Sequence, residues 1–183
     1  MVTEQDLVTA LQNSKQKEAA FRELVSQYKK QLYWHIRKIV LNHDDTDDVL
    51  QNTFIKIYRN IDSFKGDSKL YTWMYRIATN ESITFINKRA KRKQISSEEI
   101  KESTLKNLET DVYFEGKTIQ LQLQKAIASL PPKQQLVFNM KYFDDHTYDE
   151  LSEILETSVG GLKSSYHIAV KKITEYLKAN ETF

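Results

Sequence analysis

The stretch between Asp44 and Lys93 holds the side chains of this chain that are best placed to do chemistry. Carboxylates crowd its first residues, aromatic and amide side chains occupy its middle, and lysines and arginines close it. Clustered carboxylates attract basic surfaces, exposed rings stack on nucleobases, and clustered basic residues face phosphates. The stretch therefore predicts two partners: a basic protein surface and a nucleic acid strand.

The carboxylates belong to the start of a predicted helix. Asp45 is the expected N-cap, because its side chain can accept a hydrogen bond from the amide of Asp48, and the helix dipole favours acids in the first turn. Capping needs one aspartate, whereas the sequence crowds together Asp44, Asp45, Asp47 and Asp48. Like charges this close repel each other, so the excess indicates an external cationic partner.

Helical spacing gives this helix two faces and predicts a second helix after the loop Asp62–Ser68, capped by Ser68 or Asp67. The apolar face of the first helix carries Leu50, Phe54, Ile57 and Ile61, and its other face carries Asp48, Gln51, Asn52 and Ile55. The core-facing stripe of the second helix consists of Leu70, Trp73, Met74, Ile77 and Ala78. The side chains predicted to remain outside are Tyr71, Tyr75, Arg76, Thr79, Asn80 and Asn87. We interpret Trp73 as a core residue and not as a platform for a base.

The second helix ends in a basic run of Lys88, Arg89, Lys91, Arg92 and Lys93. One or two basic residues suit a helix C-terminus, because they face the negative end of the helix dipole. A run this dense indicates a patch that faces phosphates.

The composition predicts long helices. Only 4 glycines and 2 prolines occur in 183 residues, below the average usage of about 7% and 5%. Cysteine is absent, which excludes disulfides and thiol chemistry. The net charge of +2 argues neither for nor against nucleic acid. The chain shows no secretory signal and no apolar run long enough for a membrane span, so we expect a cytoplasmic protein without direct membrane insertion.

Helices are also predicted on both sides of this central stretch. The first spans residues 4–12 and the second runs from about Ser14 to Leu41, with Trp34 and His35 interpreted as packing residues. From Gln94 to about Gly116 periodicity fails and acids dominate, which indicates a linker. The prediction is therefore an all-α chain of two small helical domains, 1–93 and 118–183, joined by the flexible acidic linker 94–117.

The C-terminal domain has the pattern of a helix-turn-helix. Pro131 and Pro132 suit the first turn of a helix that supplies Leu136, Val137, Met140 and Phe143 to the core. Thr147 caps a short helix, with Glu150 completing a capping box. A turn at residues 156–158 leads into a last helix, whose inward residues are predicted to be Val159, Leu162, Tyr166, Ala169, Val170, Ile173 and Leu177. Two short-linked helices of this kind are typical of DNA-binding proteins.

No catalytic constellation, cofactor motif or metal-ligand spacing is visible, so we expect a protein that is not an enzyme. The histidines at positions 35, 43, 146 and 167 show no ligand spacing. His43 and His146 stand beside aspartates in predicted turns, and we interpret both as solvated surface residues.

Taken together, the two helical units resemble an extracytoplasmic-function (ECF) sigma factor of the sigma-70 family. The similarity covers roughly residues 15–93 and 118–178. The matching segments are DTDDVLQNTFIKIY (45–58), SFKGDSKLYTWMYRIATN (63–80) and SLPPKQQLVFNMKYFDDHTYDELSEILETSVGGLKSSYHIAVKKI (129–173). The resemblance implies a factor that binds core RNA polymerase, directs it to promoters and helps to open the DNA. It implies contacts to the β′ clamp helices and the β flap, and a partner anti-sigma factor, with the linker in the polymerase channel.

The resemblance also implies roles for particular residues. The polymerase-binding set is Asp47, Asp48, Gln51 and Phe54. The set for the minus-ten strand and the adjacent duplex is Phe64, Lys65, Gly66, Ser68, Tyr75, Arg76, Asn80, Lys88, Arg89, Lys91 and Arg92. The set for the minus-thirty-five element is Ser158, Lys163, Ser164, Ser165, His167 and Lys171. No residue is implied to be catalytic or to bind a metal.

The last helix departs from the family pattern. Ser165 stands where arginine is usual, Ile168 stands where a basic residue is common, and Gly160-Gly161 offers little side chain. Because each lost phosphate contact lowers the salt dependence by about one unit, we predict weaker or altered upstream recognition.

Two other functions fit parts of the sequence. A standalone helix-turn-helix regulator explains residues 118–178 but gives Asp44–Asn80 no role. An adaptor that binds only proteins explains the near-neutral charge but not the basic run. DNA binding without polymerase would favour the first, and the absence of any DNA effect would favour the second.

Overall fold

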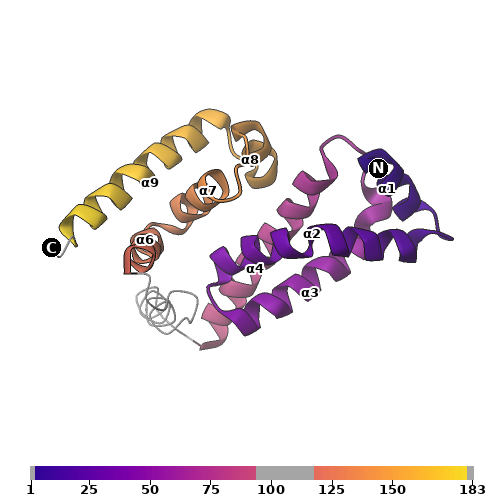
Figure 1. The fold of residues 1–183 in the computed structure, drawn as a ribbon, viewed down its shortest axis with the longest axis horizontal. Coiled ribbons are helices and arrows are strands. Elements are labelled where there is room, and N and C mark those ends of the chain that lie inside the picture. The colour runs from indigo at the N-terminus through magenta and orange to yellow at the C-terminus, as the bar shows by residue number, and fades with distance from the viewer. Residues whose placement is uncertain (1–2, 94–117, 181–183) are drawn as a thin grey trace. The chain divides into compact units, whose positions relative to one another are not determined.

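The computed structural model describes residues 3–93 and 118–180, and within these ranges every regular element is a helix. This confirms the predicted all-α class (Figure 1). The chain divides into two compact units, Met1–Ile86 and Asn87–Phe183. The predicted linker 94–117 lies outside the described residues. No helix in the described ranges is both long enough and apolar enough to span a lipid bilayer.

The N-terminal unit is built from four α-helices and one short 3-10 helix, and its last helix, α4, continues beyond the unit boundary at Ile86. In chain order these are α1 (Glu4–Gln12), α2 (Lys17–Val40), α3 (His43–Asn60), η1 (Ile61–Ser63) and α4 (Leu70–Lys93). The helix expected over residues 4–12 is confirmed, and its N-terminus is held by a capping box between Thr3 and Asp6. The core consists of fully buried apolar side chains, among them Leu11, Leu24, Leu32, Ile36, Ile57 and Met74.

The start of α3 differs from the prediction. The helix begins at His43, and its cap is Asn42, whose side-chain oxygen accepts a hydrogen bond from the amide of Asp45 at 3.0 Å. The expectation that Asp45 is the cap was wrong. The reason is that Leu41 adopts a left-handed conformation (φ 62°), which ends α2 and lets α3 start earlier than the sequence suggested. All the aspartates of the cluster therefore lie inside the helix.

The start of α4 also differs. The helix begins at Leu70, two positions after Ser68, so neither Ser68 nor Asp67 occupies the expected cap position. The amide of Leu70 instead donates a hydrogen bond to the Oε1 atom of Glu4 in α1, at 3.0 Å. A carboxylate from a distant helix thus satisfies a donor at this helix end, where the dipole favours negative charge.

α4 buries more of its surface than predicted. Tyr75 and Thr79 were expected outside but are buried. The imidazole of His35 in α2 lies 4.7 Å from the Tyr75 ring and shares a hydrogen bond of 2.9 Å between its Nε2 atom and the Thr79 hydroxyl. α4 therefore packs on α2 along a side that contains polar residues. Of the two predicted packing residues in α2, His35 is buried, whereas Trp34 is 40% exposed.

The C-terminal unit contains α6 (Thr118–Ala128), α7 (Pro132–Tyr142), α8 (Tyr148–Leu155) and α9 (Val159–Ala179). α9 packs against all three other helices, and Figure 1 shows it as the longest of them. Its core cluster is formed by Ala126, Ile127, Leu130, Phe138, Ala169 and Ile173. Two predictions are confirmed: a proline lies at the start of α7, and Thr147 and Glu150 form a capping box at the start of α8.

Three predictions for this unit were wrong. Phe143 and Val170 were expected in the core but are both 39% exposed. Val170 follows the buried Ala169, and α9 turns it away from the helices on which the core stripe packs. Phe143 lies just beyond the last residue of α7, where helical periodicity no longer fixes its direction. His146 was expected in solvent but is buried within the α7–α8 connection. Its backbone amide donates a hydrogen bond to the Met140 carbonyl, and its carbonyl accepts one from Lys141.

Candidate protein and nucleic-acid interfaces

An acidic face lies along α3, and we define it as Asp44, Asp47, Asp48 and Gln51. All of these side chains are exposed. Asp47 is 59% exposed, and the imidazole of His43 lies at 4.0 Å from its carboxylate. The structure thus presents the predicted excess of acid to solvent at the positive end of the helix dipole, where it is available to a basic partner.

Apolar side chains continue this face toward the end of α3. Ile55 is 42% exposed and Tyr58 is 36% exposed. Phe54 is half-buried, and the ring of Phe21 from α2 makes edge contacts with both Phe54 and Tyr58. Apolar groups bordered by charge are typical of surfaces that bind proteins.

The loop between η1 and α4 has a defined shape. Gly66 has φ +78°, a left-handed conformation that glycine adopts without strain, so its place in the loop has a backbone reason. Phe64 is buried, with its ring 5.3 Å from the Trp73 ring. Lys65 is exposed and Ser68 is half-buried. Phe64 therefore anchors the loop, while the polar groups near its tip face solvent.

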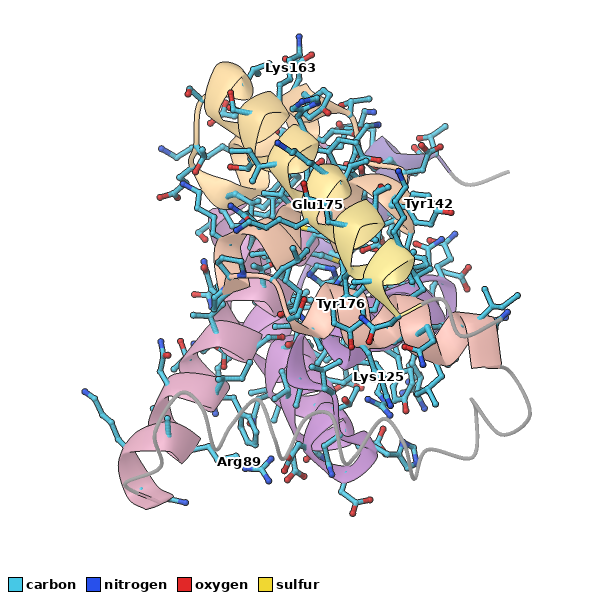
Figure 2. The ribbon with its side chains drawn as sticks, turned by 90° about the vertical axis from the view of Figure 1, so that its left-hand side faces the viewer. Arg89, Lys125, Tyr142, Lys163, Glu175 and Tyr176 are labelled. Carbon is cyan, nitrogen blue, oxygen red and sulfur yellow. The ribbon has the colours of Figure 1, made fainter. Side chains whose placement is uncertain are left out.

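The outer surface of α4 carries a polar track, which we define as Arg76, Asn80, Asn87, Lys88, Lys91 and Arg92. All of these side chains are exposed except Arg76, which is half-buried. From Leu70 to Lys91 the helix rises by about 30 Å, the length of roughly nine base pairs. Arg89, labelled in Figure 2, is half-buried on the same helix. Tyr75 does not belong to this surface: its predicted place among the exposed contact residues is corrected by its burial against His35.

The helix-turn-helix is formed by α8 and α9. Glu156 adopts a left-handed conformation that ends α8, and Ser158 caps α9 by accepting a hydrogen bond from the Gly161 amide. The exposed predicted contacts on α9 are Lys163, Ser164, His167 and Lys171, and Ser165 is half-buried. Figure 2 shows Lys163 toward one end of α9, with Glu175 and Tyr176 toward the other.

The positive charge of α9 is modest. Lys163 lies 5.7 Å from the centre of the Tyr148 ring, where a cation–π contact competes with other partners. Lys171 lies 4.0 Å from the carboxylate of Glu175, but both side chains are exposed, so solvent weakens this pair. A Cβ added at Gly160 would meet nothing within 4 Å, so that turn presents bare backbone. These features support the prediction of weak phosphate contact by α9.

Aromatic residues of α7 and α9 pack together, and the periodicity did not single out two of them, Phe138 and Tyr142. The rings of Tyr142 and Tyr166 both stack on Phe138, at 5.2 and 5.8 Å between centres. The pKa of the Tyr166 hydroxyl is raised, mainly by partial burial and to a lesser extent by the nearby Tyr148 and Tyr142. Tyr142 is 58% exposed. Phe138 and Tyr142 are four positions apart in α7, and this spacing alone only weakly predicts that two rings stack.

Among the described residues, no group of three or more histidine, aspartate or glutamate side chains is placed to hold a metal ion.

The chain matches known proteins along most of its length. Residues 24–92 match the model of Sigma-70 region 2, and residues 120–173 match that of Sigma-70 region 4. The ECF RNA polymerase sigma factor SigW of Bacillus subtilis is 32% identical over 87% of this chain and 89% of its own. The ECF RNA polymerase sigma-E factor of Escherichia coli is 30% identical over 89% of this chain and 88% of its own.

Two solved structures share the fold. CnrH, in complex with the cytosolic domain of CnrY, matches 96% of this chain with a TM-score of 0.70 and 21% identity, and 99% of CnrH is covered. The sigma factor RpoE of Bartonella quintana, in complex with the anti-sigma factor NepR, matches 88% of this chain with a TM-score of 0.69 and 21% identity, and 98% of RpoE is covered.

The two matched regions and the helical fold define a protein of the sigma-70 family. Within that family, the chain belongs to the ECF RNA polymerase sigma factors, as its identity to SigW over most of both chains shows.

The burial of Tyr75 leads to a prediction that separates core from surface on α4. Tyr75→Ala should lower the free energy of unfolding by about 3 kcal/mol, because it leaves a cavity against His35. Asn80→Ala, at an exposed position of the same helix, should change it by less than about 0.5 kcal/mol. Urea denaturation followed by circular dichroism measures both. A Tyr75→Ala variant as stable as the wild type would contradict the packing described here.

Proposed function

We propose that this chain is a transcription initiation factor that binds core RNA polymerase, directs it to a class of promoters and opens the DNA there. The observation that carries the proposal is the 32% identity to SigW across both matched regions. We further propose that the chain acts in the cytoplasm, catalyses no reaction itself and needs no cofactor, because binding surfaces alone account for these steps.

The acidic face of α3 is the proposed polymerase contact. Asp47, Asp48 and Gln51 would meet basic residues of the β′ clamp helices, and Phe54 supports them from below. The exposed Ile55 and Tyr58 would add apolar contact area next to the charges. Charge complementarity would raise the association rate, and burial of the apolar groups would slow dissociation.

The loop before α4 is the proposed capture site for a flipped minus-ten base. Lys65, Gly66 and Ser68 would line the pocket, with Phe64 as its buried wall. Asn80 and Arg76 would contact the strand farther along α4, and the exposed Lys88, Lys91 and Arg92, with Arg89, would hold the upstream duplex. Flipping a base costs a few kcal/mol, which stacking and hydrogen bonds to the base edge offset.

α9 is the proposed reader of the minus-thirty-five element. Lys163, Ser164 and His167 would lie deepest in the major groove. Ser158, Ser165 and Lys171 would lie beside the phosphates. We propose that this contact is weaker than is usual in the family, because Ser165 stands where arginine is usual and Ile168 stands where a basic residue is common.

We also propose that the β flap contacts the C-terminal unit and that an anti-sigma factor restrains the chain. The support for a restraining partner is that the RpoE neighbour was solved in complex with the anti-sigma factor NepR and the CnrH neighbour with the cytosolic domain of CnrY.

The polymerase contact can be tested by charge reversal. Asp47→Lys combined with Asp48→Lys should abolish co-elution of the chain with bacterial core RNA polymerase on a sizing column, because the reversed charges would repel a basic surface. The matched control is Glu18→Lys with Glu23→Lys, which reverses two exposed acids of α2. Unchanged co-elution of the Asp47/Asp48 variant, with an unchanged circular dichroism spectrum, would refute the docking role.

The strand contact can be tested at Asn80. Asn80→Ala should leave co-elution with the polymerase unchanged and reduce opening of a promoter fragment selected by the wild-type holoenzyme, by roughly tenfold for the loss of one or two buried polar contacts. Permanganate reactivity of thymines in the bubble measures opening. Asn60→Ala, at an exposed position of α3, is the control. Equal reactivity in wild type and Asn80→Ala would exclude this role.

The weakness of α9 can be tested by a gain of function. Ser165→Arg should add a phosphate contact, and the plot of log affinity against log salt for holoenzyme on that promoter should steepen by about one unit. Thr174→Arg adds the same charge farther along the exposed surface of α9. If the two variants steepen the slope equally, the gain comes from general charge, and Ser165 does not face the DNA.

A further inference from the structure

The first helix is bonded to both ends of the segment Ile61–Leu70, which contains the proposed capture loop. At one end, the side-chain amide of Gln12 donates hydrogen bonds to the carbonyl oxygens of Ile61 at 3.2 Å and Phe64 at 2.9 Å. At the other end, the carboxylate of Glu4 accepts a hydrogen bond from the amide of Leu70 at 3.0 Å. These contacts join residues that are 49 to 66 positions apart in the sequence.

α1 can act as one rigid body between the two ends. Glu4 and Gln12 are its first and last residues, and the rise of an α-helix places them about 12 Å apart along its axis. The helix itself is fixed, because Leu7, Val8 and Leu11 are buried in the core. The hydrogen bonds therefore attach both ends of the loop to a helix that is fixed in the core and does not move with the loop.

Other contacts also hold the segment near its first end, where Phe64 is buried with its ring 5.3 Å from the Trp73 ring. Gly66 at its tip has open space around its Cα, since an added Cβ would meet nothing within 4 Å. Asp62 forms an ion pair of 2.7 Å with Lys17 of α2, but the Asp62 side chain is 61% exposed, so solvent weakens this contact. The bonds from α1 therefore add to the burial of Phe64 in holding the ends of the segment.

We propose that α1 is a brace that preorganises the capture loop, with Gln12 and Glu4 as positioning residues for strand capture. α1 lies outside the stretch that matches Sigma-70 region 2, which begins at residue 24. The inference rests on the proposed function of the loop. A loop held in its binding shape loses less conformational freedom when the base enters, so the brace raises affinity for the melted strand. The acidic face on α3 makes none of these contacts, so polymerase docking should not depend on the brace.

The main test uses holoenzyme formed from the full chain and core polymerase. The probe is a synthetic fork-junction DNA whose single-stranded overhang has been selected by the wild-type holoenzyme from a pool randomised there. Each overhang position is then made abasic in turn. The variants are Gln12→Ala, which removes both donors, and Gln5→Ala, which truncates another exposed glutamine of α1.

We expect one abasic position to weaken wild-type binding by roughly tenfold or more, as loss of a stacked base does. Gln12→Ala should weaken binding of the intact probe by a similar factor. In this variant, removal of the base at that position should hardly change the affinity further, because the loop without its brace no longer receives the base. Gln5→Ala should behave as the wild type. The brace would be overturned if Gln12→Ala bound the intact probe as tightly as the wild type. It would also be overturned if the losses in affinity from Gln12→Ala and from the abasic position were independent and multiplied. If no abasic position changed the affinity of the wild-type holoenzyme, base capture itself would be refuted.

A second measurement needs no polymerase or DNA. In the free chain, Gln12→Ala and Glu4→Ala should speed amide hydrogen exchange of residues 65–70 by tenfold or more on the same basis, with no change in the middle of α2. Equal exchange across the loop in the variants and the wild type would overturn the proposal. A uniform rise across the whole unit would also overturn it, because that pattern reports global destabilisation.

Discussion

The N-terminal unit depends on the way α4 packs against α2 through His35. The imidazole lies against the Tyr75 ring and hydrogen-bonds the Thr79 hydroxyl, and all three side chains are buried. A buried polar pair is stable only when its geometry is satisfied, so the contact fixes both the rotation and the register of α4. Because α4 cannot rotate, Asn80 and the basic end of the helix remain on the solvent side. The surface proposed to hold DNA is thus set by a contact in the core.

The same contact shows why the sequence predicted α4 only in part. Apolar periodicity identified Leu70, Met74 and Ala78 correctly, because the hydrophobic effect selects such stripes. The same periodicity predicted that Tyr75 and Thr79 are exposed. A hydrophobic pattern does not detect a buried polar partner such as His35, which packs against both. The exposed acids of α3 and the capping box at Thr147 were predictable, since they depend on local charge and local spacing. The bonds of Gln12 and Glu4 were not, because no local pattern encodes a contact across 49 or more positions.

The near-neutral net charge of the chain does not reveal its two surfaces of opposite sign. The acidic face at the start of α3 and the basic end of α4 serve different proposed partners. At physiological ionic strength, charges interact over about 8 Å before salt screens them, so a local patch matters more than the net charge. A net charge of +2 is therefore compatible with specific binding to both a basic protein and a nucleic acid.

The weak DNA contact proposed for α9 fits a factor with several proposed DNA contacts. Once the N-terminal unit holds polymerase and the melted strand, any contact by α9 becomes intramolecular, and its effective concentration replaces part of its missing affinity. Promoter selectivity can then depend more on the captured base than on the duplex. A wrong base whose edge finds no hydrogen-bond partner in the loop can lose more binding free energy than the loss of one phosphate contact. This places the demand for precision on the loop before α4. A preorganised loop meets that demand better than a mobile one, which gives a physical reason for a helix that bonds both of its ends.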